Sequence, residues 1–203
     1  MKQIIEKSLK NSYTYEAFKA LISNLLAEGK STGPTQSKDL TNYSLLNERR
    51  MKRLDKTTTI TKDLVAIIKE INQPQTWLVL TEGWCGDAAQ NIPIINKIVA
   101  ISNCIDFKLV LRDENEGLMN LFLTNSGKAI PKLIALDKEN NVLYTWGPRP
   151  SEATKMVENY KANQGILDAN FKKDLQVWYN KNKGKNIEDD FMKLIKYSQS
   201  KAV

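Results

Sequence analysis

The chain has 203 residues, of which 41% are hydrophobic and 26% are charged, a composition typical of a soluble globular protein. No apolar run reaches the about 18–20 residues that a membrane span requires, so we expect no membrane partner. The net charge of +7 is spread along the chain without a nucleic-acid motif, so we expect a solvated basic surface and no nucleic-acid partner. Because the chain has no histidine, zinc sites with histidine ligands and Ser-His-Asp triads are excluded.

The N-terminal part of the chain predicts helices. Apolar residues recur at helical spacing over 3–28, with one break, and again over 43–55 and 62–72. In the second of these helices we expect Leu45 and Leu46 to face the core. The first residues mix charges with apolar side chains and lack a small-residue cleavage site, so no secretory signal is predicted and we expect a cytoplasmic location.

From Gln75 onward the pattern changes to alternating strands and helices, which predicts the α/β class with a mixed sheet. The predicted elements are strands 76–81, 105–111, 132–136 and 142–146, helices 85–102, 115–124 and 151–163, and two final helices, 167–182 and 186–198. This organisation predicts a helical extension over 1–74 that packs on the core, a core over 75–165 and a helical C-terminal tail over 166–203.

The most informative motif, WCGDA at 84–88, lies where the strand 76–81 ends and the next helix begins. At a helix start, unpaired backbone N–H groups and the helix dipole favour a thiolate over a thiol. The carboxylate of Asp87 has the opposite effect, because it repels a neighbouring thiolate. We therefore expect the pKa of Cys85 to lie below that of a free cysteine, but only moderately.

The chain contains two cysteines, Cys85 and Cys104, so a disulfide framework is excluded by their number. If one helix runs from Cys85 to about Ser102, the two thiols lie about 25 Å apart at 1.5 Å per residue. A disulfide requires Cα atoms within about 7 Å. We therefore expect Cys104 to be a structural thiol, and a single reactive cysteine fits a reducing compartment.

A second motif, GKAIP at 127–131, precedes the apolar run of the third strand. Together with WCGDA, it resembles the thioredoxin superfamily, in which a Trp-Cys motif at a helix start faces a cis-proline. The resemblance covers about 90 residues and implies the βαβ-α-ββα core of that fold. It also implies that Cys85 is the catalytic nucleophile.

The resemblance assigns further residues to substrate binding. Trp84 would lie beside the nucleophile and shield it, and Gly86 and Asp87 would complete the first turn of the helix. The Ile130–Pro131 peptide would be cis, with backbone groups of Ile130 pairing with an extended substrate segment. A third contact loop would contain Gly147 and Arg149, with Arg149 holding a carboxylate of a small thiol or of a partner protein, or else lying solvated in a stiff turn.

This chain departs from the thioredoxin pattern at two positions. Ala88 stands where the second cysteine would be, and Val79 replaces the buried aspartate that lies six residues before the first cysteine. Thiol–disulfide exchange proceeds through a mixed disulfide. The resemblance therefore implies a single-cysteine, Cys-x-x-Ala variant that forms mixed disulfides with protein or small-molecule disulfides. An external thiol reductant such as glutathione would resolve them, and we expect no metal or other cofactor.

Two alternatives remain open. The chain could be a redox-inactive binding module that docks a partner peptide in the cis-proline groove, or, less favoured, an iron–sulfur carrier using Cys85 with an external thiol. Reactivity of Cys85 separates the enzyme from the binding module. Glu82 is a weak candidate for the missing proton acceptor, and we favour a solvated loop carboxylate for it.

Overall fold

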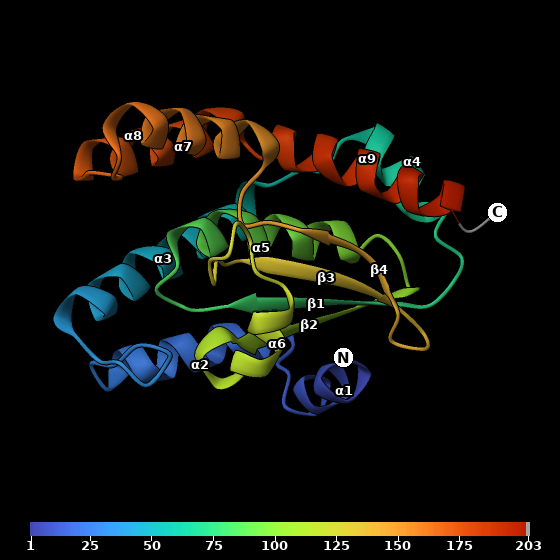
Figure 1. The fold of residues 1–203 in the computed structure, drawn as a ribbon, viewed down its shortest axis with the longest axis horizontal. Helices are drawn as coiled ribbons and strands as arrows, with labels where there is room; N and C mark the ends of the chain where they lie inside the picture. The colour runs from blue at the N-terminus through green and yellow to red at the C-terminus, as the bar shows by residue number, and fades with distance from the viewer. Residues whose placement is uncertain (202–203) are drawn as a thin grey trace.

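The computed structural model describes residues 1–201 and contains a mixed four-stranded sheet (Figure 1). The strand order is β2-β1-β3-β4. Strand β1 pairs in parallel with β2 and antiparallel with β3, and β3 pairs antiparallel with β4. The strands are β1 (Gln75–Thr81), β2 (Ile105–Leu111), β3 (Lys132–Asp137) and β4 (Val142–Trp146).

Helices connect the strands and cover both faces of the sheet. Helix α5 (Gly86–Val99) joins β1 to β2 on one face, and α6 (Glu116–Leu121) leads from β2 towards β3 on the other (Figure 1). A short 3-10 turn, Arg112–Glu114, precedes α6. Helix α7 (Ser151–Gln164) follows β4. The expected α/β class with its βαβ-α-ββα order is therefore confirmed.

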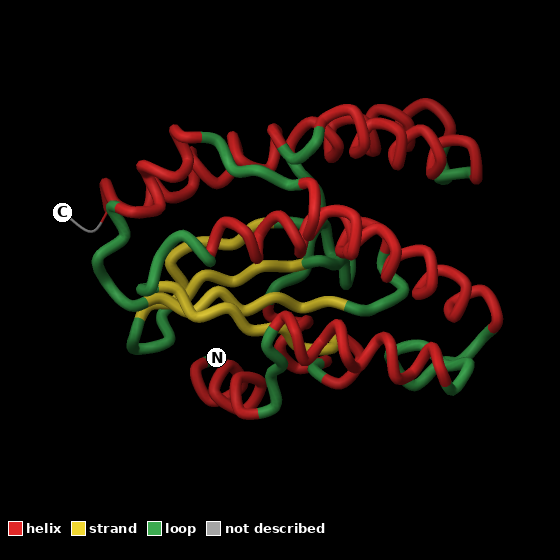
Figure 2. The backbone as a smooth tube through the Cα atoms, turned by 180° about the vertical axis from the view of Figure 1, so that it is seen from behind, coloured by secondary structure: helices red, strands yellow, loops and turns green. Residues whose placement is uncertain are grey.

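The N-terminal helices lie against both sides of this core. Helices α1 and α2 share the face of α6, while α3 runs along α5 (Figures 1 and 2). These elements are α1 (Lys2–Lys10), α2 (Tyr15–Ala27), α3 (Lys38–Thr57) and α4 (Lys62–Lys69). Within residues 1–201, no helix is long and apolar enough to cross a membrane.

The C-terminal helices are α8 (Ala169–Asn182) and α9 (Lys185–Lys201). Helix α8 packs on α7 through a small apolar cluster of their own, and α9 lies against β4, α7 and α4. The predicted division of the chain into 1–74, 75–165 and 166–203 stays a prediction. Helices from both the first and the last part contact elements of the middle part.

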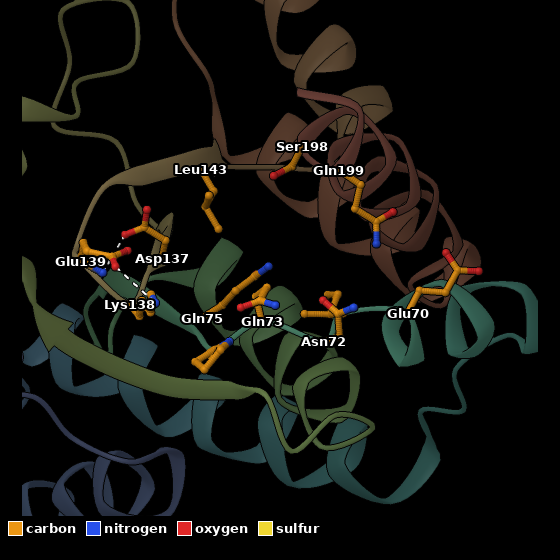
Figure 3. Close-up of a pocket in the computed structure, with 12 residues that line it drawn as sticks. Glu70, Asn72, Gln73, Gln75, Asp137, Lys138, Glu139, Leu143, Ser198 and Gln199 are labelled. Atoms are coloured by element: carbon orange, nitrogen blue, oxygen red, sulfur yellow. Dashed lines mark hydrogen bonds and ion pairs between the residues drawn. The ribbon is translucent and has the colours of Figure 1, made fainter. Parts of the chain in front are cut away.

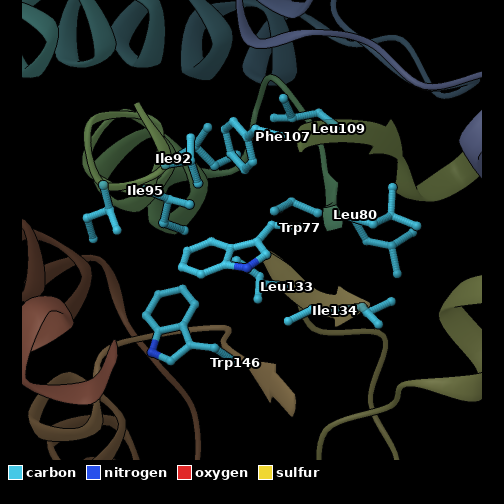
Figure 4. Close-up of a cluster of buried hydrophobic side chains, with 14 of the residues drawn as sticks. Trp77, Leu80, Ile92, Ile95, Phe107, Leu109, Leu133, Ile134 and Trp146 are labelled. Atoms are coloured by element: carbon cyan, nitrogen blue, oxygen red, sulfur yellow. The ribbon is translucent and has the colours of Figure 1, made fainter. Parts of the chain in front are cut away.

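Aromatic side chains fix α9 to the sheet. Trp77 in β1 has no exposed surface and stacks on Phe191 of α9, with ring centroids 5.0 Å apart. Trp146 of β4 lies 5.6 Å from the same Phe191 ring. Figure 4 shows Trp77 between Ile95 of α5 and Trp146. Such ring pairs contribute about 0.5–1.5 kcal/mol each beyond the area that they bury.

The prediction that Leu45 and Leu46 face the core is wrong. Both are exposed, Leu46 to 46%, and the buried face of α3 carries Ser44, Asn47 and Met51. A polar residue replaces an apolar one on this face because the Asn47 side chain donates to the Gly83 carbonyl at 2.9 Å. This contact attaches α3 to the turn between β1 and α5.

Candidate thiol site

Cys85 is the N-cap residue of α5, directly after the turn that ends β1. Its Sγ accepts the backbone N–H of Ala88 at 3.5 Å and donates to the Ile130 carbonyl at 3.3 Å. The residue is buried, with 8% of its surface exposed. The first contact is the cap of a helix start, and the second is a hydrogen bond that only the protonated thiol can donate.

Two loops meet beside the thiol. The Ile130–Pro131 peptide is cis, as is the Gly147–Pro148 peptide in the loop after β4. Gly147 has a φ of +112°, and a Cβ atom there would lie 2.1 Å from the Pro131 carbonyl oxygen. Glycine is therefore required at 147, because any side chain would push this loop away from the Ile130–Pro131 segment.

We expect Gly147→Ala to destabilise the fold by about 3 kcal/mol or more, because the added methyl group meets a backbone oxygen and the residue has a positive φ. Urea unfolding measures the loss. Gly165→Ala is the matched control, since Gly165 also has a positive φ, of +78°, but has open space around it. The control should lose only about 1–2 kcal/mol. Equal losses in the two variants would contradict the packing of Gly147 on Pro131.

Asp87 lies in the first turn of α5 and is buried, with 9% of its surface exposed. Its Oδ2 pairs with Nη2 of Arg149 at 2.7 Å, and its Oδ1 accepts the hydroxyl of Tyr179 at 2.9 Å. The amide of Asn91 donates to the same hydroxyl at 3.2 Å. A network of charged and polar groups thus joins α5 to the loop after β4 and to α8.

The expectation of a lowered pKa at Cys85 is wrong. Burial, and to a smaller extent the negative charge of Asp87, raise the pKa of the thiol to about 12. Backbone N–H groups of Ala88 and Asp87 and the charge of Arg149 act in the opposite direction and are outweighed. In the structure described, Cys85 is therefore held as a thiol.

The expectation of a solvated Glu82 is also wrong. Only 1% of its surface is exposed, and its Oε1 accepts the backbone N–H of Asp113 at 3.0 Å. Burial raises the pKa of this carboxyl group.

The guanidinium of Arg112 lies over the half-buried ring of Trp84, 4.9 Å from its centroid. The ring of the residue before Cys85 is thus in contact with a cation.

Sequence reasoning missed three side chains that surround the start of α5. A Cβ atom on Gly86 would lie 3.6 Å from Nη1 of Arg50 and 3.6 Å from Nε2 of Gln176. Tyr179 binds Asp87 from the same helix as Gln176. These residues come from α3 and α8, and no local motif marks them in the sequence.

Neither Cys104 nor residue 88 supplies a second thiol next to Cys85. Both cysteines are free thiols, and Cys104 follows the far end of α5. Because residue 88 is an alanine, which is buried, the first turn of α5 holds no second cysteine. In the part of the chain that the structure describes, no group of three or more acidic or cysteine residues is placed to hold a metal ion.

A cavity of about 530 Å³ lies at the opposite end of the sheet (Figure 3). Gln75, where β1 begins, and Leu143 of β4 line it together with Ser198 of α9. Because Cys85 follows the other end of β1, this cavity is separate from the thiol.

A sequence model of the family described as Thioredoxin matches residues 33–161. The chain belongs to the thioredoxin family. The span matched by the thioredoxin model includes α3 and the whole sheet, whereas α8 and α9 lie beyond it. No curated protein matches the chain.

Two solved structures share the thioredoxin-family fold of this chain. One is an HIV epitope-scaffold, with 16% identity, a TM-score of 0.57 and coverage of 91% of this chain and 98% of that chain. The other is a protein of unknown function from Pseudomonas aeruginosa, with 14% identity, a TM-score of 0.56 and coverage of 92% and 99%. At these identities the likeness shows the fold alone.

Proposed function

We propose that this thioredoxin-family protein exchanges disulfides through Cys85 as its single nucleophile. The observation that carries the proposal is the placement of the Cys85 sulfur at the start of α5, in contact with the Ile130 carbonyl, while residue 88 is an alanine. A disulfide formed by Cys85 then joins the protein to an outside thiol. The proposed enzyme is a monothiol, Cys-x-x-Ala variant of the family.

The exchange takes two steps. The Cys85 thiolate attacks one sulfur of a substrate disulfide, a bond forms between the two sulfurs, and the other substrate sulfur leaves as a thiolate that takes up a proton. An external thiolate then attacks the substrate sulfur of this mixed disulfide and releases Cys85. We propose protein or small-molecule disulfides as substrates, glutathione or a similar thiol as the reductant, and the cytoplasm as a compartment that supplies it.

The raised pKa of Cys85 requires that a bound substrate activates the thiol. In the proposal, a substrate segment pairs with the backbone of Ile130 and takes up the carbonyl that now accepts the thiol proton. Because a hydrogen bond to the neutral form disfavours ionisation, its loss lowers the pKa of the thiol. Trp84, Gly86, Pro131, Gly147 and Arg149 are the proposed remaining contacts of the substrate.

Burial of Cys85 and its pKa of about 12 favour a second candidate, a binding module that docks a partner peptide on the same surface without exchange. The two candidates differ in the product. An exchanging enzyme accumulates a mixed disulfide at Cys85 when a disulfide is present, whereas a binding module keeps Cys85 as a thiol.

Ala88→Cys tests the single-thiol mechanism. The backbone of residue 88 already contacts the Cys85 sulfur, at 3.5 Å from N to Sγ, so a second sulfur there is within bonding reach. After reaction with a small disulfide, we expect the variant to close an internal disulfide and to release the mixed disulfide without an external thiol. Mass measurement after alkylation shows the bond.

Ala88→Ser is the matched control, because it changes the same buried position without adding a sulfur. It should retain the mixed disulfide until a thiol is added. Persistence of the mixed disulfide in Ala88→Cys as well would show that the site departs from the geometry that the mechanism needs.

A further inference from the structure

Two arginines of α3 face the start of the thiol helix and its neighbour α8. Arg50 and Arg53 are one helical turn apart, so their side chains lie on the same side of α3. Nη1 of Arg50 lies 3.6 Å from the position of a Cβ atom on Gly86, the residue that follows Cys85. Nη2 of Arg53 donates to the Asn180 side chain of α8 at 2.8 Å. Arg50 therefore borders the residue that follows the thiol, and Arg53 extends this basic surface towards α8.

Neither arginine is neutralised by a carboxylate. Within residues 1–201, no acidic side chain forms an ion pair with Arg50 or Arg53, whose hydrogen bonds go to the neutral side chains of Asn47 and Asn180. Lys52, between them on α3, does pair with an acidic side chain, Glu48. A guanidinium has several N–H donors, and one hydrogen bond leaves most of them free for a ligand.

The local charges make this surface favourable for an anion. Burial lowers the pKa of the Arg50 guanidinium, and the charge of Arg53 lowers it further. Asp87 acts in the opposite direction, but its carboxylate is already bound by Arg149 at 2.7 Å and by Tyr179. An anion between the two arginines would relieve their mutual repulsion, and the positive end of the α5 dipole would add to the attraction.

We propose that Arg50 and Arg53 form an anion-binding edge of the Cys85 site, and that the preferred substrates are disulfides with a carboxylate close to the reacting sulfur. The inference rests on the proposed exchange function and names its substrate class. Such a carboxylate is present in small carboxylated thiols and in peptides with an acidic residue beside the cysteine. The edge would hold the carboxylate while the Cys85 thiolate attacks the adjacent sulfur.

The test compares rates of mixed-disulfide formation, followed by mass, for three small disulfides of different charge. These are 3,3′-dithiodipropionate, which is anionic, 2-hydroxyethyl disulfide, which is neutral, and cystamine, which is cationic. Each variant is compared with the wild type on the same disulfide, so differences in intrinsic reactivity cancel. For Arg50→Gln and for Arg53→Gln we expect about a three- to tenfold loss of rate with the anionic disulfide relative to the neutral one at low salt. The loss should shrink at about 0.5 M salt.

Two further variants and one further pair of probes sharpen the result. Arg49→Gln removes the same charge from an exposed neighbouring position of α3 and should leave the ratio unchanged. Arg50→Lys keeps the charge and should restore most of the ratio. Arg53→Gln changes an exposed residue, so it keeps the test valid if Arg50→Gln unfolds. Disulfide dimers of Glu-Cys-Glu and Gln-Cys-Gln peptides extend the comparison to protein segments.

A charge preference with the small disulfides identifies a small carboxylated thiol as the source, and a preference confined to the peptides identifies an acidic protein segment. If the ratio of anionic to neutral rates is the same in Arg50→Gln and Arg53→Gln as in the wild type, for both kinds of probe, the anion-binding edge is overturned and the exchange function stands. Absence of reaction with every disulfide would instead overturn the exchange function, and the inference with it.

Discussion

Cys85→Ser is expected to reduce the protein-dependent reduction of 2-hydroxyethyl disulfide by glutathione to the rate of the reaction without protein. Serine can cap α5 and contact the Ile130 carbonyl as the thiol does, so the fold should survive. It cannot form a disulfide, and the other cysteine, Cys104, follows the far end of α5. The measurement is the rate of oxidised glutathione formation with each protein at equal concentration.

Cys104→Ser is the matched control, because Cys104 is half-buried beyond the far end of α5 and forms no disulfide. Its rate should equal that of the wild type. If both serine variants lost the activity equally, Cys104 would take part in the exchange, and the separation of the two thiols along α5 would be irrelevant to the chemistry.

Asp87→Asn is expected to lower the pKa of Cys85 by about one unit or more and to raise its alkylation rate at pH 8 about tenfold. The charge of Asp87 is the largest cause of the raised pKa after burial. The carboxamide removes this charge but can still accept a hydrogen bond from Arg149 or from Tyr179. The positive charge of Arg149 is then uncompensated and favours the thiolate further.

The measurement is the pH dependence of iodoacetamide modification of Cys85. In the wild type the thiol is protonated through pH 7–10, so the rate should rise about tenfold per pH unit without reaching a plateau, given a pKa of about 12. In Asp87→Asn the plateau should move to lower pH. Asp106→Asn removes an equal charge at the start of β2, remote from the thiol, and should leave the profile unchanged. A profile unchanged in Asp87→Asn would show that burial alone suppresses ionisation.

The strands were predictable because their signals are local. The sequence predicts β2 and β4 to the residue, since each is a short apolar run bounded by polar turns. The face of α3 was not predictable in the same way. Leu45 and Leu46 are exposed because Asn47, a polar residue, points inward to bind Gly83, a partner 36 residues away. Helical spacing alone cannot identify such a partner.

The position of Cys85 at a helix start was predictable, but its electrostatic setting was not. WCGDA places Cys85 at a helix start, which favours a thiolate by itself. Burial and an ionised neighbour outweigh this effect, and both depend on contacts distant in sequence, such as the bond from Tyr179 to Asp87 across 92 residues. Glu82 differs from its expectation for the same reason, because loops that are remote in sequence cover it.

The most direct test of single-thiol exchange is the intact mass of the folded, reduced protein after incubation with 2-hydroxyethyl disulfide and then with glutathione. The account predicts a single 2-mercaptoethanol adduct, located on Cys85 by peptide mapping, which disappears when glutathione is added and leaves the free thiol. A folded protein that acquires no adduct on Cys85, while the urea-unfolded chain acquires one readily, would contradict exchange through this thiol and favour the binding module.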